Sequence, residues 1–442
     1  MSASNSFADA DYLESEASVL LAHSHAACRL SLITKNQSYR LDSALKTVLL
    51  GLKTGRIETD TATPAPSPEE FLATRVLQAL DGEHRDEDEK LVRHLFDGVY
   101  TLSLRLTTRR LWMRHQATVL SQRALDVAHA LASKAEEHDA NLMPQWLRSE
   151  FTGPKLESWR SQFGEPVLVA HRLLSFVWPL LRDVERIQQW AHRADVCPYG
   201  CGDGAGTSFA ENDPREVAQE LGFSRVAMNS LEVTEAVDID SELHSIARQM
   251  AVTVARAAAF VGAMTITDFH ATEFSVERMT VPEDDYGDAF DGAYRQVRLC
   301  EAKFPRFAEK LAVCAFDTER LEREAAQGAM LVPDIIDWCE RQGIDPDAAS
   351  SVARRCWAEA RSRQVPLTKL PREAFESIIG PVLAEQNPGR PLSCIRGIHL
   401  ILDAHGSVES RKQIGGTSTK RVREQLRNVQ IEIQRLQDAV GD

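Results

Sequence analysis

The lack of proline over one long stretch constrains the fold of this chain more than any other feature. No proline occurs between Pro214 and Pro282, and apolar residues recur there at three- and four-residue steps. That spacing places them on one face of a helix. The residues are Leu243, Ile246, Ala247, Met250, Val254, Ala257, Ala258 and Val261. Because several are small, neighbouring helices can approach closely. The pattern predicts a long, buried helix.

Two further segments show helical periodicity. Residues 167–194 form one, in which Pro179 predicts a kink because it removes a backbone donor. The final segment carries apolar residues at steps of 4, 3, 4, 3 and 4: Val422, Leu426, Val429, Ile433, Leu436 and Val440. This spacing predicts a seam for another helix, either within the subunit or across an interface. Since no alternating β pattern of comparable length appears, we predict an all-α helical bundle.

Prolines and glycines suggest the domain boundaries. Pro64, Pro66 and Pro68 predict a loop between short helices near the N-terminus. Long helices dominate the middle of the chain, and shorter helices with Gly and Pro breaks follow. We predict an N-terminal helical domain at 1–95, a central long-helix domain at 96–316 and a C-terminal helical domain at 317–442.

Charge and composition exclude some classes of function. The 442 residues carry a formal net charge of −14, so phosphates and anionic lipids would be repelled. There is no apolar run long enough to span a membrane, and the first residues are polar and acidic. The eight cysteines are scattered, as expected for reduced thiols. We expect a cytoplasmic protein that binds neither nucleic acid nor membranes.

Several motifs resemble one family. Residues 406–426 read GSVESRKQIGGTSTKRVREQL, 110–114 read RLWMR, 166–186 read PVLVAHRLLSFVWPLLRDVER and 197–206 read CPYGCGDGAG. In this order they resemble segments of the argininosuccinate lyases, in the fumarase/aspartase superfamily. The resemblance implies a three-domain helical bundle, no cofactor and a homotetramer. Because residues 275–330 are fewer than the family pattern requires, we expect shortened central helices and leave a dimer open.

The family's chemistry needs a base that removes a proton beside a carboxylate, donors that stabilise the resulting dianion, and an acid near the leaving group. Three sequence blocks supply these groups. In the first block the family has a Ser-Arg-Asn-Asp-Gln loop that grips carboxylates, and residues 100–104 of this chain read YTLSL instead. A cationic clamp is therefore replaced by mostly apolar residues. Arg105 lies next to this segment and is a candidate substrate-binding residue.

The second block also departs from the family. Its Thr-His-x-Gln motif corresponds to Trp159, Arg160, Ser161 and Gln162. An arginine stays protonated and cannot shuttle a proton at neutral pH. The glutamate that partners the family's histidine corresponds to Ala236, with Glu235 adjacent.

The third block should carry a mobile loop with a serine base and a lysine. This chain has no serine between Val276 and Ala349 and no lysine between Leu156 and Ala302. Four aspartates, Asp284, Asp285, Asp288 and Asp291, occupy the region, which reverses its sign of charge. We therefore do not expect the ordinary elimination that releases fumarate.

Other constellations have simpler interpretations. Cys197 and Cys201 lack the second pair or nearby histidine that a tetrahedral metal site needs, so we predict no metal site. The glycines from Gly200 to Gly206 favour a turn over a nucleotide cradle. His171, inside a predicted helix, is either a partly buried structural histidine or a proton shuttle. His23 is expected on the surface.

Two functions remain open. The first is an enzyme with altered chemistry on a small amino-acid-derived or carboxylate substrate, in specialised metabolism. Its candidate catalytic residues are His171, Arg160 and Glu235, and its candidate substrate-binding residues are Gln162, Asn229, Ser230, Arg105 and Tyr286. The second is a non-catalytic descendant that acts as an oligomeric binding or regulatory partner.

Overall fold

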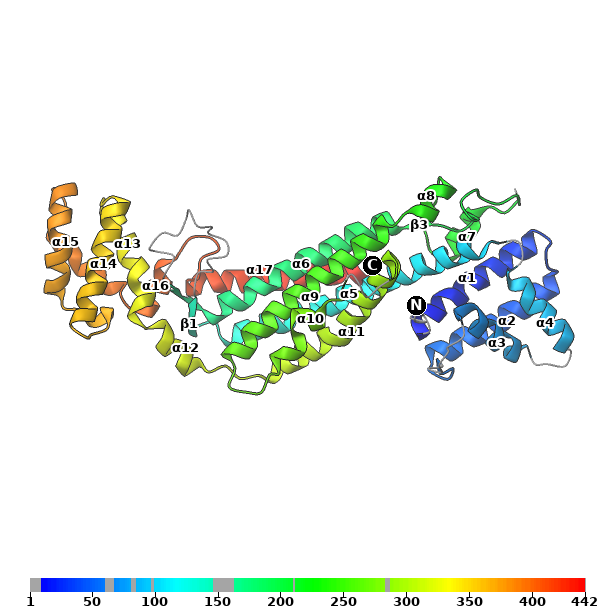
Figure 1. Ribbon diagram of the computed structural model, residues 1–442, viewed down its shortest axis with the longest axis horizontal. Coiled ribbons are helices and arrows are strands. Elements are labelled where there is room, and N and C mark those ends of the chain that lie inside the picture. The colour runs from blue at the N-terminus through cyan, green and yellow to red at the C-terminus, as the bar shows by residue number, and fades with distance from the viewer. Residues whose placement is uncertain are drawn as a thin grey trace. The chain divides into compact units, whose positions relative to one another are not determined.

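The structure is a computed structural model that describes residues 9–59, 67–80, 85–96, 99–145, 163–209, 211–282 and 287–441. These residues are mostly helical, and their strands form two short pairs (Figure 1). They cluster into two compact units. The first unit comprises 1–123, 183–252 and 277–302, and the second comprises 124–182, 253–276 and 303–442. The all-α fold is confirmed, whereas the three-domain division stays a prediction.

Long helices contribute residues to both units. They are α5 (Thr101–Glu137), α6 (Val169–Ala194), α9 (Asp238–Met264) and α11 (Ala289–Val313). The residues from Leu243 to Val261 that predicted a long helix lie in α9, and all eight are buried. Pro179 lies inside α6. Within the described residues, no helix combines the length and apolar character needed to cross a membrane.

The first unit also contains helices that are shorter than these four. They are α1 (Ala10–Arg29), α2 (Lys35–Lys53), α3 (Pro68–Ala79), α4 (Arg85–Arg93), η1 (His94–Phe96), α7 (Pro214–Glu220) and α8 (Ser230–Glu235). Side chains of α1, α2 and α3 share one apolar core, which includes Leu20, Leu45 and Leu72. Capping boxes start α2 at Thr34 and α3 at Ser67, where side chains satisfy the first free amides.

The second unit contains two groups of elements. Its strands β1 (Leu142–Gln145) and β2 (Glu165–Leu168) pair antiparallel, Leu142 opposite Leu168. Its shorter helices are η4 (Ala271–Phe274), α12 (Thr318–Ala325), η6 (Gly328–Leu331), α13 (Val332–Arg341), α14 (Pro346–Ser362), η7 (Leu367–Lys369), α15 (Arg372–Gln386), η8 (Leu392–Leu400) and α16 (Ala404–Ser410). An apolar core joins α13, α14 and α15 through residues such as Ile335, Val352 and Phe375. The short α10 (Val276–Met279) begins at the unit's boundary.

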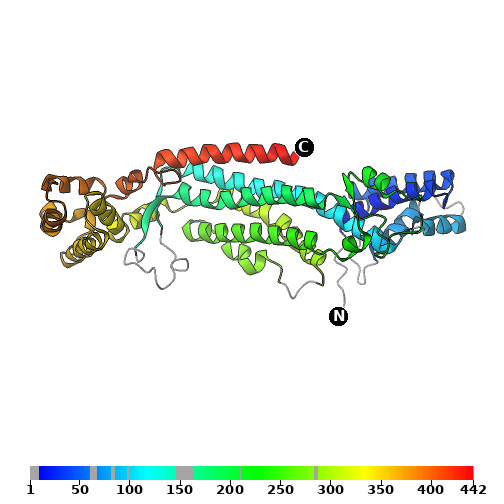
Figure 2. The ribbon, with the colours of Figure 1, turned by 90° about the horizontal axis from the view of Figure 1, so that it is seen from above.

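The heptad-patterned segment forms the final helix, α17 (Thr419–Gly441), as predicted. Its seam is buried within the subunit, from Val422 to Leu436. In the second unit α17 runs beside α5, as the red and cyan helices of Figure 2 show, and residues of both helices line one cavity. Arg423 also pairs with Asp139, 2.7 Å apart. The sequence left open whether this seam packs within the subunit or across an interface. The structure shows that it is covered within the subunit.

We expect the two isoleucines of α17 to respond differently to truncation. Ile433 is buried in the seam, whereas Ile431 is 67% exposed. Ile433→Ala should cost about 2–5 kcal/mol because it leaves a cavity in the core, and Ile431→Ala should change stability by less than about 0.5 kcal/mol. Thermal unfolding of both variants tests this, since helix propensity changes equally in each. Equal losses of melting temperature would contradict the buried seam.

Candidate functional site

The segment that corresponds to the family's carboxylate-gripping loop is used for packing. Helix α5 begins at Thr101, and Ser103 and Leu104 are buried. The Ser103 hydroxyl oxygen accepts a hydrogen bond from the Gly200 amide at 2.9 Å. Because Ser103 is fully buried within the first unit, its hydroxyl is not exposed to a substrate carboxylate.

The glycine-rich segment at 197–206 forms a turn, as predicted. Gly200, Gly202, Gly204 and Gly206 all have positive φ, which favours glycine. The strand β3 (Val196–Cys197) that leads into it pairs with β4 (Arg225–Val226). Burial raises the pKa of the Cys197 thiol to about 12, so the thiol is protonated at neutral pH.

The surface prediction for His23 is wrong. His23 is fully buried in α1, and its Nδ1 lies 2.7 Å from the Tyr199 hydroxyl of the glycine-rich turn. Both residues belong to the first unit. A buried polar ring needs a hydrogen-bond partner, and the turn supplies one.

Three predicted site residues lie together on α8. Asn229 caps the helix, since its Oδ1 accepts hydrogen bonds from the Leu231 and Glu232 amides, both at 3.0 Å. The Ser230 hydroxyl donates to the Gly204 carbonyl oxygen at 2.7 Å. Glu235 is exposed at the end of the helix. Asn229 and Ser230 therefore support the turn and the helix.

Arg105 lies on the exposed side of α5, where its guanidinium pairs with Glu69 at 3.3 Å. Behind this pair, Glu16 of α1 is buried. Burial and the nearby Glu69 raise the pKa of Glu16 to about 8, although Arg105 opposes the shift. At neutral pH the Glu16 carboxyl group is mostly protonated.

Some predicted residues lie outside the described part of the chain. They are Trp159, Arg160, Ser161 and Gln162 of the second block, together with Tyr286. Asp284 and Asp285 are also outside it. Asp288 is described, and its carboxylate pairs with Arg109 at 3.1 Å.

His171 lines a cavity of about 500 Å³ in the second unit. Burial and the adjacent Arg172 lower the pKa of His171, so its imidazole is neutral at pH 7. Its Nδ1 is buried and has no hydrogen-bond partner among the described residues. His171 and the α8 residues belong to different units.

Charged side chains from three places in the sequence surround this cavity. Glu165 comes from β2, Asp337 and Arg341 come from α13, and Arg411 and Lys412 come from the segment between α16 and α17. None of these five residues was predicted from the sequence as a site residue. The only signal was the family signature at 406–426, which contains Arg411 and Lys412 but identifies ancestry and not a site.

A buried network holds Arg411 in position. Its Nη1 donates to Asp334 Oδ1 at 3.1 Å and to Ser407 Oγ at 2.6 Å. Ser407 Oγ in turn donates to Asp334 Oδ2 at 2.7 Å. Burial raises the pKa of Asp334 to about 6, while Arg411 and Ser407 favour its charged form. Arg411 Nη2 has no hydrogen-bond partner in the described part of the chain, although it lies 3.6 Å from Glu165 Oε1.

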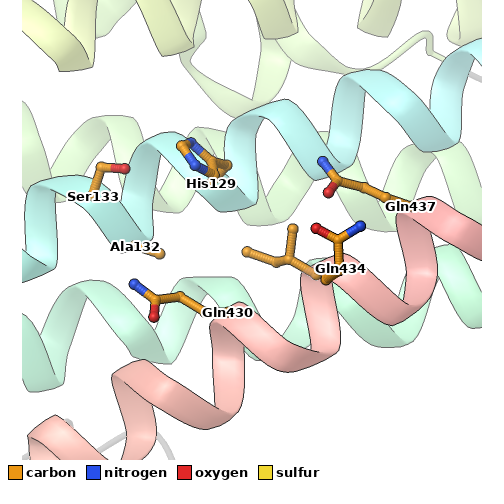
Figure 3. Close-up of a pocket in the computed structure, with 7 residues that line it drawn as sticks. His129, Ala132, Ser133, Gln430, Gln434 and Gln437 are labelled. Atoms are coloured by element: carbon orange, nitrogen blue, oxygen red, sulfur yellow. The ribbon is translucent and has the colours of Figure 1, made fainter.

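A second cavity, of about 320 Å³, lies between α5 and α17 (Figure 3). Three glutamines of α17, Gln430, Gln434 and Gln437, face His129 and Ser133 of α5 across it. No Asp, Glu, Lys or Arg lines this cavity. It offers only weak, mostly neutral hydrogen bonds, so the charged cavity beside His171 is the better candidate site.

Solved structures show which fold this is. EDDS lyase in complex with formate is similar with a TM-score of 0.70 and 15% identity, and the match covers 98% of this chain and 88% of that one. A 3-carboxy-cis,cis-muconate lactonizing enzyme from Pseudomonas putida gives a TM-score of 0.63 at 14% identity, covering 96% and 95%. At these identities the likeness shows a shared helical fold alone.

Sequence relatives define the family more narrowly. The profile of the lyase family matches residues 104–280. The argininosuccinate lyase of Kineococcus radiotolerans is 30% identical over 370 residues, which cover 73% of this chain and 72% of that protein. That of Bifidobacterium longum is 28% identical, covering 94% and 87%. The chain belongs to the argininosuccinate lyase family.

We expect the glycine-rich turn to depend on the lack of a side chain at Gly202. A Cβ there would lie 2.2 Å from the Gly206 carbonyl oxygen, whereas Gly222, also at positive φ, has open space around it. Gly222→Ala should therefore cost only the backbone strain, about 1–2 kcal/mol. Gly202→Ala should cost more, because the turn must also move. Thermal unfolding measures both, and equal losses would contradict the close approach.

Glu16 should make stability depend on pH. Its pKa is raised from 4.5 to about 8 in the folded protein, so the folded state holds a proton that the unfolded state releases. The contribution to stability is full below about pH 4.5 and is lost as pH rises to about 8. Glu16→Gln cannot ionise, so the variant should gain stability relative to the parent over this range. Urea unfolding at several pH values tests this, and a constant difference would contradict it.

Proposed function

We propose that this member of the argininosuccinate lyase family is an enzyme with altered chemistry, acting on a small amino-acid-derived or carboxylate substrate. The observation that carries the proposal is the charged cavity beside His171. Its volume suits a small molecule. Arg341 and Lys412 have no ion-pair partner within the described residues, so both are available to a ligand carboxylate.

The chemistry we propose centres on the neutral imidazole. Because its pKa is lowered, His171 can accept a proton at neutral pH from a substrate held by the neighbouring cations. We propose Arg160 and Glu235 as further catalytic residues, and Gln162, Asn229, Ser230, Arg105 and Tyr286 as substrate-binding residues. The burial of Ser103 argues against ordinary argininosuccinate cleavage, because the carboxylate grip of the first block is replaced by packing.

One observation favours a second candidate, a non-catalytic binding or regulatory partner. Asn229 and Ser230 are used by α8 and the glycine-rich turn, and Arg105 pairs with Glu69. Polar residues retained at such positions can be explained by structure alone.

We also propose a homotetramer in the cytoplasm, with a dimer as the alternative. The free cysteines among the described residues, mostly buried, suit a reducing compartment. The long helices α5, α6, α9 and α11 provide the surfaces on which copies of the chain would assemble.

Incubation of the purified protein with argininosuccinate, adenylosuccinate, aspartate and malate tests the proposal. Ultraviolet absorbance detects fumarate, and NMR follows each substrate. If the chemistry is altered, the protein should not release fumarate at an ordinary enzymatic rate. The lower end of such rates is about 1 s⁻¹. NMR should then show an amino-acid-derived substrate consumed to another product, and the His171→Asn variant should lose this turnover at an unchanged melting temperature.

Fumarate release at an ordinary rate would overturn the proposal. If neither these compounds nor a wider panel of substituted aspartates is consumed, the non-catalytic candidate is favoured instead.

A further inference from the structure

Helix α2 presents a basic face, although the protein as a whole is acidic. The chain carries a formal net charge of −14, yet α2 contains four basic residues and a single acid, Asp42. Its buried side chains, among them Leu41 and Val48, belong to the core shared with α1 and α3. The exposed side chains lie on the opposite side of the helix and form its outer face. They are Lys35, Asn36, Tyr39, Ser43, Lys46, Thr47, Leu50 and Lys53.

Two large apolar side chains stand out on this outer face. Tyr39 is 73% exposed and Leu50 is 54% exposed. Leu50 follows Tyr39 by 11 residues, so both lie on one side of α2, about 16 Å apart along its axis. Residues at steps of 4, 3, 4 and 3 connect them and continue to the end of the helix: Tyr39, Ser43, Lys46, Leu50 and Lys53. This is the spacing with which one helix packs along another.

The lysines at the two ends of α2 are not used by the helix itself. Lys46 pairs with Asp42 at 2.9 Å, whereas Lys35 and Lys53 have no ion-pair partner in the part of the chain that the structure describes. Lys35 is the first residue of α2, and the first turn contains no acid. A positive charge at this end opposes the helix dipole, so Lys35 does not stabilise the helix. Both terminal lysines are available to an external anion.

We propose that the outer face of α2 binds an acidic amphipathic helix of a partner protein. Apolar residues of that helix would pack on Tyr39 and Leu50, and its acids would pair with Lys35 and Lys53. Ser43 is small and lies between the two apolar side chains, which lets the partner helix approach closely. The inference goes beyond the proposed function and does not depend on it.

Other anionic partners fit the outer face less well. Nucleic acids and anionic membranes carry extended negative charge, which the net charge of −14 repels at long range. Membrane binding also scales with the apolar area that is buried, and this face offers only two large apolar side chains. A short acidic helix needs favourable charge over α2 alone.

A synthetic peptide tests this inference on the full chain. The peptide carries leucines at alternating three- and four-residue steps with glutamates on either side, so that its helix has one apolar face with acidic edges. Fluorescence anisotropy should show that it binds, and added salt should weaken binding because the ion pairs are screened. Two control peptides should each bind about fivefold more weakly or worse. One has the same composition with its leucines spread around the helix, and the other has lysine in place of glutamate.

Four variants locate the binding on α2. Tyr39→Ser and Leu50→Ser should each weaken binding of the acidic peptide about fivefold or more, because each removes an apolar contact at the centre of the interface. Lys35→Gln and Lys53→Gln should each weaken it about twofold to fivefold, the effect of losing one exposed ion pair.

Matched control variants come from other helices. Leu231 of α8 is 53% exposed, close to the value for Leu50, and Lys420 of α17 is exposed like the terminal lysines of α2. Leu231→Ser and Lys420→Gln make the same chemical changes away from α2, so both should leave the affinity for the acidic peptide unchanged. A melting temperature measured for each variant identifies any that fails to fold.

Several results would overturn the inference. They are no binding of the acidic peptide at about 1 mM, equal affinities for the three peptides, or effects as large in the Leu231 and Lys420 controls. Tighter binding to vesicles that contain phosphatidylserine would replace the partner protein with a membrane. Loss of self-association in Leu50→Ser, measured by light scattering, would replace it with a second copy of this chain.

Discussion

The buried ion pair between Asp334 and Arg411 constrains much of the second unit. Removing two charges from water is costly, and the attraction between them compensates only when their other donors and acceptors are bonded. Ser407 bonds to both partners, which joins α13 and α16 at one point. Loss of one partner would leave an uncompensated buried charge. The chain that follows Arg411 passes close to its carbonyl oxygen, and Gly416 permits this because it has no Cβ.

The need of polar groups for hydrogen-bond partners also explains the polar residues of the first unit. Ser103, Asn229 and Ser230 lie where the family resemblance suggests a substrate site, yet each bonds to backbone groups of a turn or helix end. Helix ends and glycine turns leave amides and carbonyls that need partners. Polar residues at inherited positions are therefore weak indicators of chemistry. The charged groups around His171 are better indicators, since two cations there lack internal partners in the described structure.

The sequence predicted the helices well because their signal is local. The periodic apolar residues of α9 and α17 each occur within one short segment, and burial follows directly from that spacing. The site was harder to predict because its groups meet only in the folded chain. His23 and Tyr199 are 176 residues apart, so nothing near His23 indicated a buried partner. Likewise Arg341 of α13 and Arg411 of the segment after α16 join one cavity from distant parts of the sequence, and only Arg411 lay in a recognised motif. His171 was identified by its place in a family segment, and the structure adds the charges around it.

In the function that we propose, the neutral state of His171 would connect ligand binding to proton transfer. Burial and Arg172 lower the pKa of His171, which leaves the neutral imidazole able to accept a proton. A carboxylate placed nearby would stabilise the imidazolium and raise that pKa. Binding of an acidic ligand would thus make the same imidazole a stronger base than it is in the free protein. This proposed coupling would give the mixed charges a chemical role, because Arg341 and Lys412 would determine which carboxylate lies beside the imidazole and hence when the proton can move.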